Sequence, residues 1–151
     1  MGGNVVGLAP ETREDPQAVV SGSDPDLSIV IVGYNSLPEL GECLASVRDT
    51  GASLRLDTVV VDNASTDGTV EFLRREHPNV RVVANGRNVG YSKAVNQGIA
   101  ESRARYVLVL NPDIVVLPDS LQKLIASMDE RPDVAIAGSK LLNPDGTLQY
   151  L

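Results

Sequence analysis

The sequence has few of the residues that build covalent or metal-bound scaffolds. Among its 151 residues are one cysteine, Cys43, and one histidine, His77. A single cysteine cannot form an internal disulfide, which excludes a disulfide-stabilised fold and favours a reducing compartment. One histidine and one cysteine cannot supply a structural zinc site. Cys43 is therefore predicted to be an inert thiol beside a helix's buried face, and His77, which precedes Pro78, to end a helix.

Long apolar runs and targeting signals are also lacking. No run approaches the ~20 residues of a membrane-spanning helix. The first residues show neither a signal peptide nor the pattern for N-myristoylation, so we expect a cytoplasmic protein. The formal net charge of −7 argues against a nucleic-acid-binding surface.

Three familiar site motifs are absent. The glycines form neither the G-x-G-x-x-G pattern of dinucleotide-binding domains nor the G-x-x-x-x-G-K-[ST] pattern of P-loops. The G-x-S-x-G motif of hydrolases is also missing. These absences exclude the commonest phosphate-binding loops and the commonest serine nucleophile.

The composition that is present is typical of one soluble domain. Hydrophobic residues make up 42% of the chain and charged residues 22%. Residues 1–26 differ, because they contain three prolines and carry five acidic residues against one arginine. We predict a flexible acidic leader over residues 1–26 and a folded domain over residues 27–151.

In that domain, short apolar runs alternate with helical periods. Strands are predicted at Leu27–Val32, Thr58–Val61, Val80–Ala84, Tyr106–Leu110 and Val134–Gly138. Between them, four helices are predicted. The first starts from Ser36 as N-cap, with Glu39 completing a capping box and with Leu40, Leu44 and Val47 inward. The others are predicted over Gly68–His77, over Tyr91–Ser102 with Ala94, Val95, Gly98 and Ile99 inward, and over Asp119–Glu130 with Leu121, Leu124, Ile125 and Met128 inward. This alternation predicts an α/β fold: a mostly parallel sheet with helices on both faces.

Polar segments follow each of the first four predicted strands. They are Gly33–Asn35, Asp62–Gly68, Asn85–Gly90 and Asn111–Asp113. Ligands of such sheets bind beyond the carboxyl ends of the strands, so these segments form the candidate site. Each also has an ordinary structural explanation: Ser65 or Asp67 caps the next helix, or glycine allows a positive φ.

Taken together, SIVIVGYNS, VVVDNASTDGT, NVGYSKAVNQGI and YVLVLNPDIVVLPDSL resemble family 2 glycosyltransferases of GT-A fold, nearest to the rhamnosyltransferase-like branch. The resemblance covers Leu27 to about Tyr150. It implies transfer of a sugar such as rhamnose, with inversion, from a UDP- or dTDP-sugar to a polysaccharide or lipid-linked acceptor. It also allows association of a full-length enzyme with the cytoplasmic face of a membrane.

The resemblance assigns roles to individual residues. Tyr34 would pack on the base or ribose, a carboxylate or amide after the second strand would accept a pyrimidine N3–H, and Asp113 would bind Mn²⁺ or Mg²⁺. Asn88, Gly90 and Lys93 would line the diphosphate and the sugar. The full set of implied nucleotide-binding residues is Val32, Gly33, Tyr34, Asn35, Asp62, Asn63, Asn88, Gly90, Lys93, Asn111 and Pro112.

The sequence departs from the family pattern at three places. The commoner D-D-G-S motif is Asp62-Asn63-Ala64-Ser65 here, and the D-x-D motif is Asn111-Pro112-Asp113, which leaves one carboxylate for the metal. The general base that the family needs has no candidate here and is expected beyond Leu151. We therefore expect a donor-binding portion truncated at its C-terminal end. The alternative hypothesis is a nucleotide-binding module without turnover, from a truncated or degenerate homologue.

Overall fold

The computed structural model describes residues 24–149, and the predicted leader lies outside this range except for Asp24–Asp26. Four strands form one parallel sheet in the order β3-β2-β1-β4. Their bounds are β1 Leu27–Gly33, β2 Leu56–Asp62, β3 Arg81–Ala84 and β4 Tyr106–Leu110. The helices are α1 Leu37–Thr50, α2 Thr69–Glu76, α3 Tyr91–Glu101 and α4 Ser120–Asp129.

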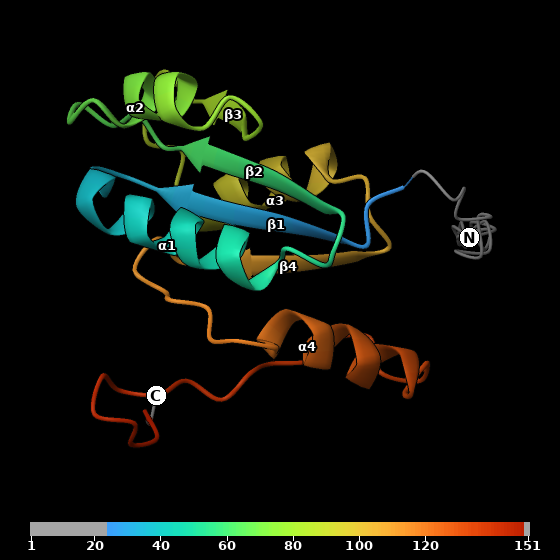
Figure 1. Ribbon diagram of the computed structural model, residues 1–151. Coiled ribbons are helices and arrows are strands. Elements are labelled where there is room, and N and C mark those ends of the chain that lie inside the picture. Colours follow the sequence, from blue (N-terminus) through green and yellow to red (C-terminus); the bar gives the residue numbers. More distant parts are fainter. Residues whose placement is uncertain (1–23, 150–151) are drawn as a thin grey trace, which may run out of the picture.

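Helices cover both faces of the sheet, as predicted, and α1 and α3 lie on opposite sides of it (Figure 1). The central strand β1 is buried along its whole length, and its alternate side chains enter two separate cores. Ile29 and Ile31 pack with side chains of α1, α2 and α4, whereas Val30 and Val32 pack with Ala94 of α3. A strand that is buried on both faces explains the almost uninterrupted apolar run.

The inward face of α1 is confirmed, and its predicted capping is wrong. Leu40, Cys43, Leu44 and Val47 are all buried. Ser36 occupies the N-cap position, but its hydroxyl makes no capping hydrogen bond. Instead, the carboxylate of Asp67 accepts the Leu37 N–H at 3.1 Å. The carboxylate of Asp67, from a loop distant in sequence, therefore caps α1 in place of Ser36.

Two predictions about the faces and edges of the sheet are also wrong. Ile99 is 44% exposed, because α3 approaches the sheet through Ala94 and Gly98, four residues apart, and Ile99 lies about 100° further round the helix. Val134–Gly138 is not a strand: within residues 24–149 no ladder joins it to a neighbour, and Ile136 is 89% exposed. The apolar pattern fits a strand, but a strand exists only where an adjacent backbone completes its hydrogen bonds.

Residues Asn143–Gly146 form a turn. The Gly146 N–H donates to the Asn143 carbonyl at 2.8 Å, and Leu142 and Leu148 form an antiparallel bridge on either side. Among the described residues, no helix is long and apolar enough to cross a membrane.

Candidate functional site

The candidate site lies where the parallel strands end. The register pairs Gly33 of β1 with Asp62 of β2, and Asp62 with Ala84 of β3, so three strand ends are level. The chain leaves β1 toward β2 on one side, and β4 lies on the other side of β1. This reversal of strand order is the point at which α/β sheets bind ligands. The four polar segments predicted from sequence therefore meet at one edge.

The segments after β1 and β2 hold each other in place. The Asn35 side-chain oxygen accepts the Thr66 N–H at 2.8 Å, and the Asn35 N–H donates to the Ser65 hydroxyl at 2.9 Å. Asn35 has a φ of +50° and Ala64 a φ of +70°, both in the left-handed region that non-glycine residues seldom adopt. Both segments are thus fixed by hydrogen bonds in backbone conformations that sequence alone does not favour.

Asp67 connects these segments to two helices. One carboxylate oxygen accepts the Leu37 N–H, and the other accepts the Thr69 N–H at 3.1 Å and the Thr69 hydroxyl. Burial raises the pKa of Asp67, but these hydrogen bonds outweigh it and hold the pKa below its usual value. The structural explanation offered for Asp67 is therefore confirmed.

Asp62 has a buried carboxylate with an unused oxygen. Its side chain is 2% exposed, and Oδ2 accepts the Ser65 N–H at 3.0 Å. Oδ1 is buried and has no hydrogen-bond partner among residues 24–149, and the same is true of the Ser36 hydroxyl near Gly33. Buried polar atoms in proteins are almost always paired. Asp62 Oδ1 is thus a buried acceptor that no described residue satisfies.

Asn63 binds the next loop rather than facing outward. Its side chain is buried, its Oδ1 accepts the Val89 N–H at 2.9 Å, and its Nδ2 donates to Asn88 Oδ1 at 3.0 Å. Asn88 Oδ1 also accepts the Gly90 N–H at 2.9 Å. The predicted residues Asn63, Asn88 and Gly90 are therefore brought together as one bonded group.

Gly90 begins α3 with a conformation available only to glycine. Its φ is +86° and its ψ 156°, and apart from its two chain neighbours no atom of the described residues lies within 4 Å of the position that a Cβ would occupy. Lys93 lies in the first turn of the same helix and is exposed. The N-terminus of α3 is thus open, and a cationic side chain lies in its first turn.

The segment after β4 is attached to α1. The Cys43 thiol donates to the Asn111 carbonyl at 3.8 Å, and the Val116 N–H donates to the Ser46 hydroxyl at 3.0 Å. Burial, with a smaller contribution from the charge of Asp113, raises the pKa of Cys43 to about 11, so the thiol is neutral as predicted. Asp113 itself is exposed, and no hydrogen bond or ion pair of its carboxylate occurs among residues 24–149.

The remaining predicted residues take different positions. Val32 is buried in the core beneath α3, and Pro112 is half-buried. Tyr34 is 55% exposed. Tyr91, which the sequence indicated only as the start of a helix, is 53% exposed, and its hydroxyl donates to Asn111 Oδ1 at 3.3 Å. Its position directly after Gly90 is the one sequence signal that places it at this edge.

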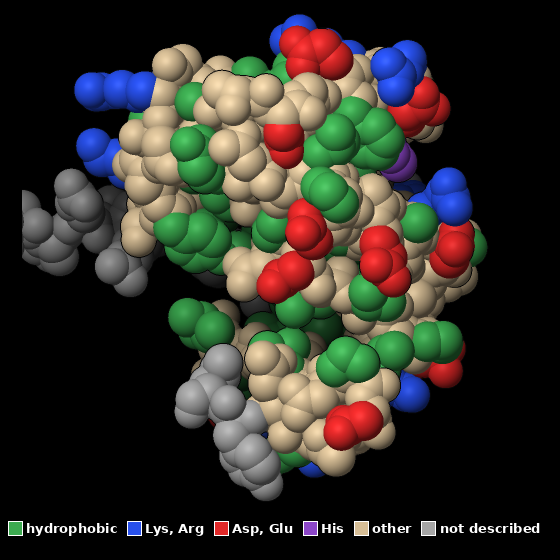
Figure 2. Space-filling view, turned by 90° about the vertical axis from the view of Figure 1, so that its left-hand side faces the viewer, with side chains coloured by type: hydrophobic (Ala, Val, Ile, Leu, Met, Phe, Trp, Pro, Cys, Tyr) green, Lys and Arg blue, Asp and Glu red, His purple; other side chains and the backbone are tan. Residues whose placement is uncertain are grey.

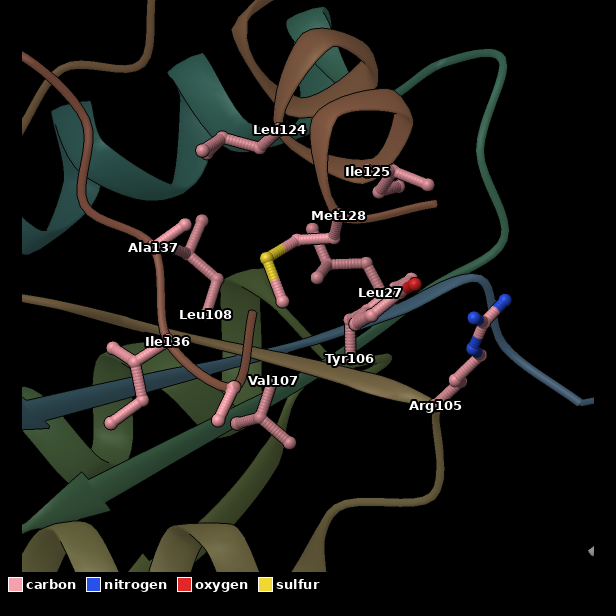
Figure 3. Close-up of a pocket in the computed structure, with 11 residues that line it drawn as sticks. Leu27, Arg105, Tyr106, Val107, Leu108, Leu124, Ile125, Met128, Ile136 and Ala137 are labelled. Atoms are coloured by element: carbon pink, nitrogen blue, oxygen red, sulfur yellow. The ribbon is translucent and has the colours of Figure 1, made fainter. Parts of the chain in front are cut away.

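The strand-end segments lie on one face of the molecule. Figure 2 looks onto the edge where β1 and β2 end and shows acidic side chains toward the middle, with basic ones mainly near the margin. A cavity of about 290 Å³ lies elsewhere, between β4, α4 and residues 135–137, and is lined by apolar side chains such as Leu108 and Met128 (Figure 3). Within residues 24–149, no three His, Cys, Asp or Glu side chains are grouped to hold a metal ion.

Comparison with known proteins identifies the family. Residues 28–150 match the sequence profile described as Glycosyl transferase family 2. The chain belongs to this family. This chain is similar to the N-acetylglucosaminyl-diphospho-decaprenol L-rhamnosyltransferase of Mycobacterium tuberculosis, with 32% identity over 133 residues. The matched region covers 81% of this chain and 43% of that protein. This chain is 34% identical over 122 residues to the succinoglycan biosynthesis protein ExoO of Rhizobium meliloti, covering 80% and 34%.

Solved structures agree with this assignment. The family 2 chain superposes on the mannosyltransferase from Pyrobaculum calidifontis in complex with GDP-Man and Mn²⁺ with a TM-score of 0.64 and 25% identity, over 87% of this chain and 38% of that one. It superposes on S. aureus TarS 1-349 in complex with UDP with a TM-score of 0.62 and 25% identity, over 71% and 33%. The expected GT-A fold is confirmed. The chain spans less than half the length of these relatives.

Proposed function

We propose that this chain binds a UDP- or dTDP-sugar for inverting transfer of the sugar, such as rhamnose, to a polysaccharide or lipid-linked acceptor. The observation that carries the proposal is the unpaired Asp62 oxygen at the edge where all four strand-end segments meet. The similarity to a rhamnosyltransferase with a lipid-linked acceptor in its name supports the choice of substrates. The cytoplasm, at the surface of a membrane, is the proposed location.

Asp62 is the proposed acceptor for the nucleobase. Uracil and thymine carry a ring N3–H, which a carboxylate oxygen accepts, whereas adenine has no ring N–H on its pairing edge and its only donor there is the exocyclic N6 amino group. Asn63 is not available as an acceptor in this role, because Val89 and Asn85 already donate to its oxygen. Tyr34, at the end of β1 and half-exposed, offers an aromatic face to the base or ribose.

The N-terminus of α3 is the proposed diphosphate site. The open N–H groups at a helix start and the helix dipole favour negative charge. Gly90 leaves the space in front of these groups free of a side chain, and Lys93 adds a positive charge. Asn88 fixes the Gly90 N–H through its own oxygen and so sets the shape of this helix start.

Asp113 is the proposed ligand of a divalent cation, with Asn111 beside it. Carboxylate and amide oxygens suit Mg²⁺ or Mn²⁺, and the exposed Asp113 carboxylate has no bond to a described residue. One carboxylate predicts weak binding that depends on the diphosphate. When bound, the cation neutralises the leaving diphosphate. Acidic side chains in the middle of this face make such neutralisation necessary (Figure 2).

A second candidate function is nucleotide binding without turnover by this chain. Inverting transfer needs a base on the acceptor hydroxyl. Two exposed carboxylates after α4, those of Asp133 and Asp145, already have partners. Asp145 accepts the Thr147 N–H and hydroxyl, which lowers its pKa, and Asp133 lies 3.6 Å from Arg131. We keep the proposal that the general base lies beyond Leu151 in a longer protein.

A thermal-shift experiment tests donor and metal binding together. UDP or dTDP should stabilise the 151-residue chain, and Mn²⁺ should increase the shift, because a ligand of the native state stabilises it by RT ln(1 + [L]/Kd). Asp113→Ala should remove the metal-dependent part and keep the fold. Asp133→Ala, another exposed carboxylate, should retain it. Equal metal-dependent shifts in both variants would show that Asp113 does not bind the cation.

Calorimetry with ADP tests the base contact. ADP should bind roughly 5- to 150-fold more weakly than UDP, because its ring nitrogen cannot donate to the Asp62 oxygen and an unpaired buried acceptor costs about 1–3 kcal/mol. Asp62→Asn, which replaces an acceptor by an amide that can rotate, should reduce this preference. Equal affinities for ADP and UDP in the unsubstituted protein would eliminate Asp62 as the base contact.

A further inference from the structure

Three side-chain amides connect the middle of α3 to the proposed donor site. Gln97 and Asn85 form a reciprocal pair: Gln97 Nε2 donates to Asn85 Oδ1 at 3.0 Å, and Asn85 Nδ2 donates to Gln97 Oε1 at 2.9 Å. Asn85 Nδ2 also reaches Asn63 Oδ1 at 3.4 Å. All three side chains are at least partly buried. The chain of amides runs from α3, through the residue after β3, to the residue after β2.

Backbone N–H groups fix which way these amides face. An amide oxygen and nitrogen are distinguished by their partners, and a backbone N–H can only donate. The Val89 N–H therefore identifies Asn63 Oδ1, and the Gly90 N–H identifies Asn88 Oδ1. With both oxygens assigned, Asn63 Nδ2 must donate to Asn88, as observed. The network has one self-consistent set of orientations.

We propose that Asn85 and Gln97 are positioning residues of the donor site. They act through Asn63, which in turn holds Val89 and Asn88 and thereby the Gly90 N–H at the start of α3. This inference rests on the proposed function, since it gives the ordered loop Asn85–Gly90 the task of receiving the nucleotide. Neither residue belongs to the set that sequence reasoning assigned to the donor.

The loop needs such a device because little else orders it. The Asn85 N–H still bonds to the Asp62 carbonyl, but beyond it the backbone has left the sheet. The side-chain oxygens of Asn63 and Asn88 receive the Val89 and Gly90 N–H groups. The orientation of the Asn63 side chain depends on its neighbours. The Asn85–Gln97 pair holds it through the contact between Asn85 Nδ2 and Asn63 Oδ1.

The network also accounts for the amide at position 63. An aspartate there would accept the Val89 N–H equally well, but it has no hydrogen to donate to Asn88. Two oxygens would then face each other at the present Asn63–Asn88 contact of 3.0 Å. Rotating the Asn88 amide would relieve that repulsion and lose the bond from Gly90. The residues around position 63 thus require an amide.

The test compares two glutamines that each make two hydrogen bonds. Gln97→Leu removes the bonds to Asn85, and Gln122→Leu removes bonds to Thr50 and Ser53, which lie at the end of α1 and just beyond it. Both glutamines are half-buried. UDP affinity with Mn²⁺ is measured by calorimetry, and exchange of the Val89 and Gly90 amide hydrogens by NMR, at a temperature where circular dichroism shows both variants folded.

We expect Gln97→Leu to raise the Kd for UDP roughly tenfold and to speed exchange at Val89 and Gly90, while Gln122→Leu changes neither. Gln97→Glu, which accepts from Asn85 but cannot donate to it, should have an intermediate effect and serves if the leucine variant does not fold. The three amides do not ionise, so the leucine effect should be the same at pH 6 and pH 8.

The outcomes separate this inference from the proposed function. If the unsubstituted protein binds neither UDP nor dTDP, the proposed function fails and the positioning role fails with it. If it binds UDP and Gln97→Leu binds equally well, the positioning role alone is wrong. Unchanged amide exchange at Val89 and Gly90 in Gln97→Leu would likewise overturn it, because the loop would then be ordered without the pair.

Discussion

Ala64 adopts a backbone conformation that alanine disfavours. Its φ of +70° lies in the left-handed region, where a non-glycine residue costs on the order of 1–3 kcal/mol. The hydrogen bond between the Ser65 N–H and Asp62 and the bonds of Thr66 and Ser65 to Asn35 hold it there. Strain in this turn is thus offset by the contacts that shape the strand ends.

Replacing Ala64 by glycine should stabilise the protein by about 0.5–1 kcal/mol, since relief of strain exceeds the entropy that glycine adds to the unfolded chain. Urea unfolding measures the change. Ala126→Gly, within α4, is the control and should destabilise by about 1 kcal/mol, because there glycine adds entropy and relieves nothing. A loss of stability in both variants would contradict the assignment of strain to Ala64.

Cys43 makes stability depend on pH in the alkaline range. Its pKa is raised to about 11 in the folded protein, against a usual value of 9.0. The unfolded chain therefore loses the thiol proton first, so this contribution is complete below pH 9 and is lost as pH rises toward 11. Cys43→Ala should show a smaller decline of the free energy of unfolding between pH 8 and pH 10.5. The same decline in both proteins would assign it to other groups.

At the scale of elements, α3 packs closely on the sheet because of one glycine. A Cβ on Gly98 would overlap the Val30 side chain and lie 3.2 Å from that of Val61. Val30 and Val61 belong to the central strands, which cannot yield without disturbing the ladder. The close approach keeps the start of α3 at the height of the strand ends, where the proposed diphosphate site lies.

Gly98→Ala should destabilise the protein by about 1–3 kcal/mol, as overpacking does in a dense core. Gly41→Ala in α1 is the matched control, because its Cβ would meet Phe72 at an ordinary 3.6 Å. That variant should gain about 0.5–1 kcal/mol from better helix propensity. Thermal or urea unfolding measures both, and changes of the same sign would contradict the packing argument.

At the scale of the whole molecule, apolar side chains remain uncovered after α4. Ile136 is 89% exposed, Leu142 46% and Leu148 39%, and Val107 on β4 is 38% exposed. In the described residues β4 is an edge strand with one neighbour, β1. Exposed apolar surface next to a strand edge favours association.

We therefore expect weak, concentration-dependent self-association of this chain. Sedimentation velocity should show it, and Ile136→Ser should reduce it. Val115→Ser is the control. Val115 is 49% exposed but precedes α4 and follows the proposed metal-binding segment, so it is not part of the surface around Ile136, and association should be unchanged. A monomer at all concentrations, or an equal effect of both substitutions, would show that the surface around Ile136 does not associate.

The sequence by itself determined the local and periodic features. Uninterrupted apolar runs such as Leu27–Val32 indicate strands that are buried on both faces. Polar residues after each run indicate that the strand ends there. The α/β order and the strand-end site were therefore predictable. The family was predictable for a related reason: four motifs in register specify one arrangement of those ends.

Tertiary structure alone decided which groups bind one another across the chain. Asp67 rather than Ser36 caps α1, and Asn63 binds Val89 and Asn88, because these partners lie 25 to 30 residues apart and meet only through the sheet register. The predicted fifth strand is absent for the same reason: Val134–Gly138 has the composition of a strand, but no backbone in the part of the chain that the structure describes pairs with it. The local sequence pattern determines which secondary structures a segment can form. The hydrogen-bond partners that the fold supplies determine which one it forms.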